Sequence, residues 1–349
     1  MKKLFILAGQ LVVLVFSFCT PASERFTISA RVSDVSEGTV FYLANTRDNF
    51  LIDSCYLRNG NLFFEGKLSR VENLLLHATD KVSKEFIYTL LVMGNDNVVF
   101  NASQKDFPWN IDASGSEDQD VAEKFNQVEY QRQKLKASMN EKVSGISGLD
   151  QLKVELIKKY FNTYAALINF KIYRLNFQTE ELNALYEGLS PELKESVYGG
   201  AIKKQIEYPP AIVGGPYYDY TAVDQNGDTI SLSDIGNKYI LLHFSSSACY
   251  ASQQALPEMK TLYHRLKDKL EIVKLSGDAS IKTWQASIRQ DSIPWLNLWD
   301  GEGDYGDAII KYGVIGTPNF VLISPDKTIV DKWFGYEEGL IEEKIEEHL

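Results

Sequence analysis

The hydrophobic pattern of this 349-residue chain changes twice along its length, which predicts three folded regions. From about Phe26 to Ala102, apolar and polar residues alternate in short runs separated by turn residues, a pattern typical of strands with one buried face. From about Ser114 to Glu207, apolar residues recur at three- and four-residue spacing, which predicts amphipathic helices. After about Pro209, apolar runs alternate with helical patterns, as an α/β fold with a mixed sheet requires.

Turn and cap residues refine this division. Asn59–Gly60 supplies the backbone of a tight turn between two strands, and Ser190 followed by Pro191 predicts the start of a helix. Thr179, followed by two glutamates, predicts another helix start. We therefore expect four segments: a leader at 1–22, a small antiparallel β domain at 24–110, a helical domain at 114–207 and an α/β domain at 208–349.

The N-terminus is typical of an export signal. Two lysines precede a mostly apolar stretch, Leu4–Phe18, which is short for a membrane-spanning helix. Cys19 follows directly, as the acceptor cysteine of a bacterial lipoprotein signal does, although Phe18 stands where such signals have a small residue. The alternative is cleavage after Ala22, which would release a soluble protein. Both predict a periplasmic or cell-envelope location, and the first predicts a lipid anchor.

Without Cys19, the chain has only two thiols, Cys55 and Cys249. Two cysteines are too few for a disulfide framework, so the stability of the folded chain must come from packing. Cys55 lies on a predicted strand, where the simplest interpretation is a small buried residue. A disulfide with Cys249 would require the two Cα atoms to lie within about 7 Å.

Charge and motif content exclude several classes of partner. The net charge of −11 is spread along the chain without a basic block, which excludes nucleic acid as an expected partner. The four histidines, at 77, 243, 264 and 348, lack metal-ligand spacing, and the glycines around Gly303 lack the spacing of a dinucleotide loop. We therefore expect neither a metal nor a cofactor.

The chemistry of the last region centres on one cysteine. A predicted buried strand, Tyr239–Phe244, leads through Ser245–Ala248 to Cys249 at the start of a long helix, and Gly316-Thr317-Pro318 later precedes another strand. A thiolate at a helix N-terminus is stabilised by free N–H groups, which lowers the thiol pKa. The position therefore suits a reactive thiol.

These features resemble the thioredoxin-like proteins, most closely the TlpA/ResA-like envelope group, which is related to AhpC/TSA. The resemblance implies a thioredoxin fold in which Cys249 matches the nucleophile. Pro318, after Thr317, matches the proline that the family holds cis beside that cysteine as a recognition element. The stretch LIDSCYLRNGNLFFEG also resembles the β domain that precedes such domains in certain envelope proteins.

The sequence departs from that family where the second cysteine should be. Ser252 stands there, and a hydroxyl cannot form the disulfide that releases a substrate, which excludes a dithiol cycle within this motif. His243 occupies the strand position where thioredoxins place a buried polar residue. It could act as a base or a cationic partner for Cys249, or simply pack with its nitrogens satisfied by backbone.

Three functions follow from this combination. The first is monothiol exchange between Cys249 and the disulfides of envelope proteins or small thiols. The second is a binding module that keeps the fold without turnover, since the fold alone does not decide function. The third, a thiol peroxidase, is disfavoured because Leu242 and Ser246 stand where such enzymes have proline and threonine.

Overall fold

The computed structural model describes residues 24–47, 50–138 and 146–349. The leader predicted at 1–22, with Cys19, lies outside these residues. Within them, no helix is long and apolar enough to cross a bilayer.

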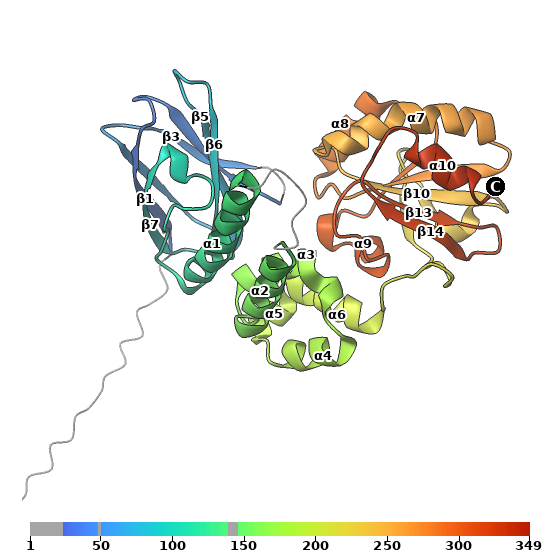
Figure 1. Ribbon diagram of the computed structural model, residues 1–349, viewed down its shortest axis with the longest axis horizontal. Helices are drawn as coiled ribbons and strands as arrows, with labels where there is room; N and C mark the ends of the chain where they lie inside the picture. Colours follow the sequence, from blue (N-terminus) through green and yellow to red (C-terminus); the bar gives the residue numbers. More distant parts are fainter. Residues whose placement is uncertain (1–23, 48–49, 139–145) are drawn as a thin grey trace, which may run out of the picture.

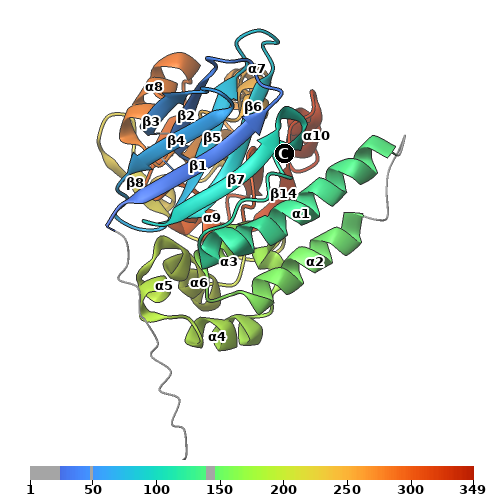
Figure 2. The same cartoon turned by 90° about the vertical axis from the view of Figure 1, so that its left-hand side faces the viewer.

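The N-terminal region is a β domain of two facing sheets (Figure 1). One has the order β4-β1-β7 and the other the order β3-β2-β5-β6, and their inward apolar side chains form one core. Figure 2 shows the first sheet in front of the second. The strands are β1 Phe26–Ser33, β2 Val40–Asn45, β3 Leu51–Tyr56, β4 Asn61–Gly66, β5 Glu72–Thr79, β6 Phe86–Met93 and β7 Asn97–Ser103.

Strand pairing in the β domain is antiparallel, as predicted, except between β1 and β7, which run parallel. Asn59 and Gly60 form the predicted tight turn with positive φ angles of 49° and 72°. The strands on either side of it do not pair over their length, because β3 joins β2 and β4 joins β1. The turn therefore passes the chain from one sheet to the other.

The middle region is helical, as predicted, and aromatic side chains including Phe161, Phe170 and Phe177 form its core. Ser190 caps α5 by accepting a hydrogen bond from the Leu193 N–H, and Pro191 takes the first helical position. The predicted cap at Thr179 is one residue late, since Gln178 is the N-cap of α4. The helices are α1 Glu117–Ser138, α2 Ile146–Lys159, α3 Tyr164–Tyr173, α4 Thr179–Glu187, α5 Pro191–Glu195 and α6 Val197–Glu207.

The C-terminal region is a seven-stranded mixed sheet with helices on both faces, which confirms the predicted α/β thioredoxin-like class. The strand order is β14-β13-β10-β11-β12-β8-β9. Helices α7 and α10 cover one face and α9 the other. The elements are β8 Thr221–Val223, β9 Thr229–Ser231, β10 Tyr239–Ser245, α7 Tyr250–Leu266, β11 Leu270–Ser276, α8 Ile281–Asp291, β12 Leu296–Trp299, α9 Asp307–Lys311, β13 Asn319–Ile323, β14 Ile329–Phe334 and α10 Leu340–Glu346.

The helical region joins the other two parts of the chain. Arg174 is buried and donates hydrogen bonds to the backbone oxygens of Ile309 and Val314 in the α/β domain. On the other side, Gln119 of α1 accepts a hydrogen bond of 2.9 Å from the N–H of Val92 in β6. Both contacts use buried polar groups, so they fix how the helical region is oriented against its two neighbours and also add stability.

Candidate functional site

Cys249 stands at the N-cap of α7, directly after the loop that leaves the central strand β10. Its own N–H donates to the Ser246 oxygen at 3.1 Å, and its carbonyl accepts from the Gln253 N–H at 3.2 Å. The residue is partly exposed, and its thiol is not in a disulfide. A free thiol on a partly exposed residue at a helix start is suitably placed to react with a disulfide.

The loop before Cys249 is held by Asp278, which follows β11. The Asp278 carboxylate accepts hydrogen bonds from the backbone N–H and the hydroxyl of Ser247, at 3.1 and 2.8 Å. Ser276 donates to the same carboxylate at 2.9 Å. Asp278 was not recognised in the sequence, because its partner Ser247 lies 31 residues away and no local pattern connects them.

The segment before β13 faces the cysteine. The Thr317–Pro318 peptide bond is cis, as the family resemblance implied, and the Cys249 thiol donates to the Thr317 oxygen at 3.2 Å. The Pro318 oxygen in turn accepts from the Gly335 N–H at 2.9 Å. The structure therefore brings together Cys249, Thr317 and Pro318, three of the residues singled out in the sequence.

Ser252 lies one turn into α7 and is fully buried. Its hydroxyl donates to no acceptor in the described part of the chain while the Cys249 thiol is protonated, but it can donate to the Cys249 sulfur once that thiol is ionised. Partial burial raises the pKa of Cys249, but hydrogen bonds from the side chains of Ser252 and Thr317 and from the Ser252 and Ala251 N–H groups outweigh that effect, and the pKa is lowered. The serine that replaces the second cysteine thus supports the thiolate.

His243 lies on β10, buried and stacked on Phe320 with ring centroids 4.9 Å apart. Burial, together with the positive charge of Lys274, lowers its pKa to about 3. The ring is therefore neutral near pH 7, which argues against a cationic partner for the thiolate. The other interpretation was a packed ring whose nitrogens bond to backbone groups. The ring is packed, but neither nitrogen has a hydrogen-bond partner among the described residues.

A buried ion pair next to His243 went unrecognised in the sequence. Lys274 of β11 pairs with Asp291 at the end of α8, and both side chains are inaccessible to solvent. A signal was present, since a single lysine within the apolar run of β11 needs a nearby carboxylate to be buried at all. The partner itself, 17 residues away on a helix, could not be identified from the pattern.

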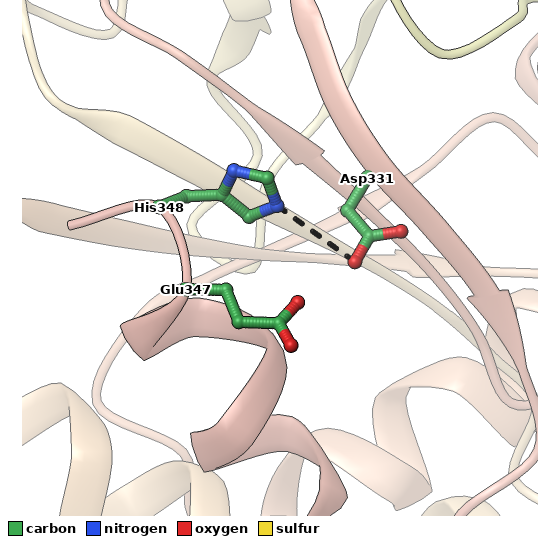
Figure 3. A group of neighbouring side chains, drawn as sticks. All are labelled: Asp331, Glu347 and His348. Atoms are coloured by element: carbon green, nitrogen blue, oxygen red, sulfur yellow. Dashed lines mark ion pairs between the residues drawn. The ribbon is translucent and has the colours of Figure 1, made fainter.

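Among the residues that the structure describes, one group of side chains able to ligate a metal comes together away from Cys249. Asp331, Glu347 and His348 lie near each other at the C-terminus, with His348 Nε2 3.9 Å from an Asp331 oxygen (Figure 3). The Lys344 ammonium lies 3.2 Å from Asp331 and 4.0 Å from Glu347, so it forms an ion pair with each carboxylate. The arrangement is therefore explained as a surface ion-pair cluster.

Cys55 is the second free thiol in the described chain, half-buried on the edge strand β3 of the β domain. Burial raises its pKa, with a further contribution from the negative charge of Asp53, against a hydrogen bond from the Phe63 backbone. A thiol with a raised pKa is a poor nucleophile at neutral pH. The pKa of the Cys55 thiol is thus raised, whereas that of the Cys249 thiol is lowered.

The fold and the Cys249 site define a thioredoxin-like domain, and comparisons with known proteins agree. A family model described as thioredoxin-like matches residues 236–329, and a model of a domain of unknown function, DUF4369, matches residues 26–122. The thiol-disulfide oxidoreductase ResA of Bacillus cereus is 27% identical over 163 residues, which cover 46% of this chain and 88% of ResA. In sequence, the C-terminal domain is thus similar to thiol-disulfide oxidoreductases.

Two further matches each cover a little over a third of the chain. A probable nucleoredoxin of Arabidopsis thaliana is 26% identical over 125 residues, 35% of this chain and 21% of that protein. Among solved structures, the thioredoxin domain of a thiol-disulfide oxidoreductase from Bacteroides vulgatus is 25% identical, with a TM-score of 0.35, over 38% of this chain and 98% of that one.

Proposed function

We propose that the protein carries out thiol-disulfide exchange through Cys249 alone. One observation supports this above all: Cys249 is a partly exposed residue at the N-cap of α7, and hydrogen bonds lower the pKa of its thiol. The similarity of this domain to thiol-disulfide oxidoreductases supports the same chemistry. The disulfide partners would be proteins of the cell envelope or small thiols.

In the proposed step, the Cys249 thiolate attacks one sulfur of a substrate disulfide. A new disulfide joins Cys249 to that half of the substrate, and the other half leaves as a thiolate. A second, external thiolate then attacks the substrate sulfur, which releases the substrate and regenerates the Cys249 thiolate. The hydroxyl of Ser252 cannot take that role, because it can donate to the sulfur but cannot form a disulfide.

The proposed location is the periplasm or cell envelope, because the leader reads as an export signal and Cys19 as a lipid acceptor. An oxidising compartment supplies disulfides, which are the substrates that this chemistry needs. A lipid on Cys19 would anchor the protein to a membrane.

The Ser252→Cys variant tests the missing resolving group. We expect the native protein to retain a mixed disulfide at Cys249 after reaction with one equivalent of a protein disulfide in the absence of added thiol. In the variant, a thiol one turn along α7 would attack that bond, so the adduct should fall by about tenfold or more while a disulfide between Cys249 and the introduced cysteine appears. Site-resolved mass spectrometry measures both.

Two results would count against single-cysteine exchange. If the native protein releases its adduct as fast as Ser252→Cys does, another group resolves it. If Cys249 forms no adduct at all, the domain acts as a binding module. A Ser252→Ala variant is the matched control, since it changes the same buried position without adding a thiol.

A further inference from the structure

A cavity of about 680 Å³ lies where the three regions of the chain meet. Asn73 and Leu90 line it from the β domain, Tyr198 from α6, and Gly277 and Ala279 from the α/β domain. The last two flank Asp278, which holds the Ser247 backbone just before Cys249. The cavity therefore borders the loop that positions the reactive sulfur.

The same face of the four-stranded sheet continues beyond the cavity as a row of aromatic side chains. Alternation along β5 and β6 places His77 on the face of Asn73, and Phe86 and Tyr88 on the face of Leu90. The rings contact one another in sequence. The ring centroids are 5.5 Å apart between Tyr42 and His77, 5.8 Å between His77 and Phe86, and 5.8 Å between Phe86 and Tyr88. We call Tyr42, His77, Phe86 and Tyr88 the aromatic strip.

The α/β domain presents its Cys249 edge toward this face. Strand β10 begins near the C-terminus of the chain, because the Tyr239 hydroxyl donates to the His348 oxygen. The other end of β10, which leads to Cys249, therefore lies on the side of this domain that faces the β domain in Figure 1. Around Cys249, Tyr250 is 75% exposed and Phe334 61% exposed. Phe86 of the aromatic strip is 62% exposed. Large aromatic side chains are thus exposed both on the aromatic strip and around Cys249.

We propose that the aromatic strip and the Cys249 edge together bind an extended, cysteine-containing polypeptide, so that the β domain selects protein disulfides for exchange. This inference rests on the proposed function of Cys249. Spaced rings along a sheet face suit the alternating side chains of an extended chain. The strip and the cavity share one sheet face, which offers a bound chain a continuous surface toward Cys249.

The charge of the cavity favours a polypeptide over a small anionic disulfide. Among the described residues, most charged side chains that line the cavity form ion pairs: Arg70 with Glu72, Lys171 with Asp304, and Glu302 with Lys204. The lining also holds Glu192, Glu195 and Arg47, so its balance is negative. A negative lining repels an anionic ligand, whereas a polypeptide segment with neutral or basic side chains is not penalised. An extended chain also reaches the strip, which a small thiol could not contact while bound at Cys249.

The test compares two probes that both react with a thiolate. One is a ten-residue peptide with apolar residues around a single cysteine in a disulfide with thionitrobenzoate. The other is the small reagent dithiobis(nitrobenzoate). Both release thionitrobenzoate when Cys249 attacks, so absorbance gives both rate constants. In Phe86→Ala/Tyr88→Ala we expect the ratio of the peptide rate to the small-reagent rate to fall about tenfold.

Phe63→Ala is the matched control, since Phe63 is a similarly exposed phenylalanine, 56%, on β4 of the other sheet. Its ratio should equal that of the native protein. An unchanged ratio in the double variant would overturn the proposal. So would a change in oligomeric state caused by the double variant, because a second copy of the chain would then be what covers the strip.

A binding measurement keeps this inference separate from the chemistry of Cys249. The same peptide, alkylated at its cysteine and labelled with a fluorophore, is titrated with the Cys249→Ser protein, and its anisotropy is followed. We expect binding that weakens about tenfold in Phe86→Ala/Tyr88→Ala and not in Phe63→Ala. Binding of this kind with an inert Cys249 would refute the proposed exchange alone, whereas a reactive Cys249 with no strip dependence would refute the binding surface alone.

Discussion

Replacing Cys249 by serine is expected to abolish mixed-disulfide formation by the folded domain. A serine hydroxyl is not ionised near pH 7 and cannot form a disulfide, so the loss should be complete rather than partial. The measurement is the yield of adduct from a protein disulfide, resolved by site with mass spectrometry.

Hydrogen peroxide should oxidise the Cys249 thiol of the native protein only slowly. Fast formation of a sulfenic acid would indicate a peroxidase instead.

Cys55→Ser is the matched control for that loss. Burial raises the pKa of Cys55, so its thiol should contribute little at neutral pH and its removal should leave the adduct yield unchanged. Retention of adducts in Cys249→Ser together with their loss in Cys55→Ser would move the chemistry to the β domain and contradict the proposed site.

The largest stability effect is expected at the buried pair of Lys274 and Asp291. Asp291→Ala leaves the Lys274 ammonium uncompensated beneath the central sheet, which should lower the free energy of unfolding by about 3–5 kcal/mol. Denaturant unfolding followed by tryptophan fluorescence measures this, since four of the five tryptophans lie in this domain.

Two further variants show whether the unpaired charge of Lys274 causes the loss of stability in Asp291→Ala. Lys274→Met/Asp291→Leu removes both charges with apolar side chains of similar size, and it should recover most of the lost stability. Glu207→Ala breaks an exposed pair with Lys203, and it should change stability by no more than about 0.5 kcal/mol. If the double variant is as unstable as Asp291→Ala, the effect comes from packing and not from the lone charge.

Much of this architecture could be predicted because short apolar runs with turn residues constrain strands strongly. The order of elements after Pro209, the buried strand β10 and the helix start at Cys249 follow from local pattern and capping. The parallel pairing of β1 with β7 could not be predicted, because it joins segments about 70 residues apart, and the described residues between them contain no helix to indicate a crossover. The switch of β3 and β4 into different sheets is likewise set by the common core and not by the turn.

The candidate site was predictable only as far as its chemistry is local. Cys249 and Ser252 are neighbours on one helix, so their relation could be read from spacing. Asp278 and the Lys274–Asp291 pair depend on which elements pack together, and so does the environment of His243. Burial fixes the protonation of that histidine, and burial is a property of the fold rather than of any short pattern.

The account depends most directly on the ionisation of one sulfur, which the pH dependence of iodoacetamide alkylation at Cys249 measures. Only the thiolate reacts, so the rate rises with pH through the thiol pKa. We predict a midpoint for the folded protein below that of the same cysteine in urea, and a shift upward in Ser252→Ala, which loses a hydrogen bond to the thiolate. A folded midpoint equal to or above the unfolded one would contradict the assignment of Cys249 as the reacting thiolate.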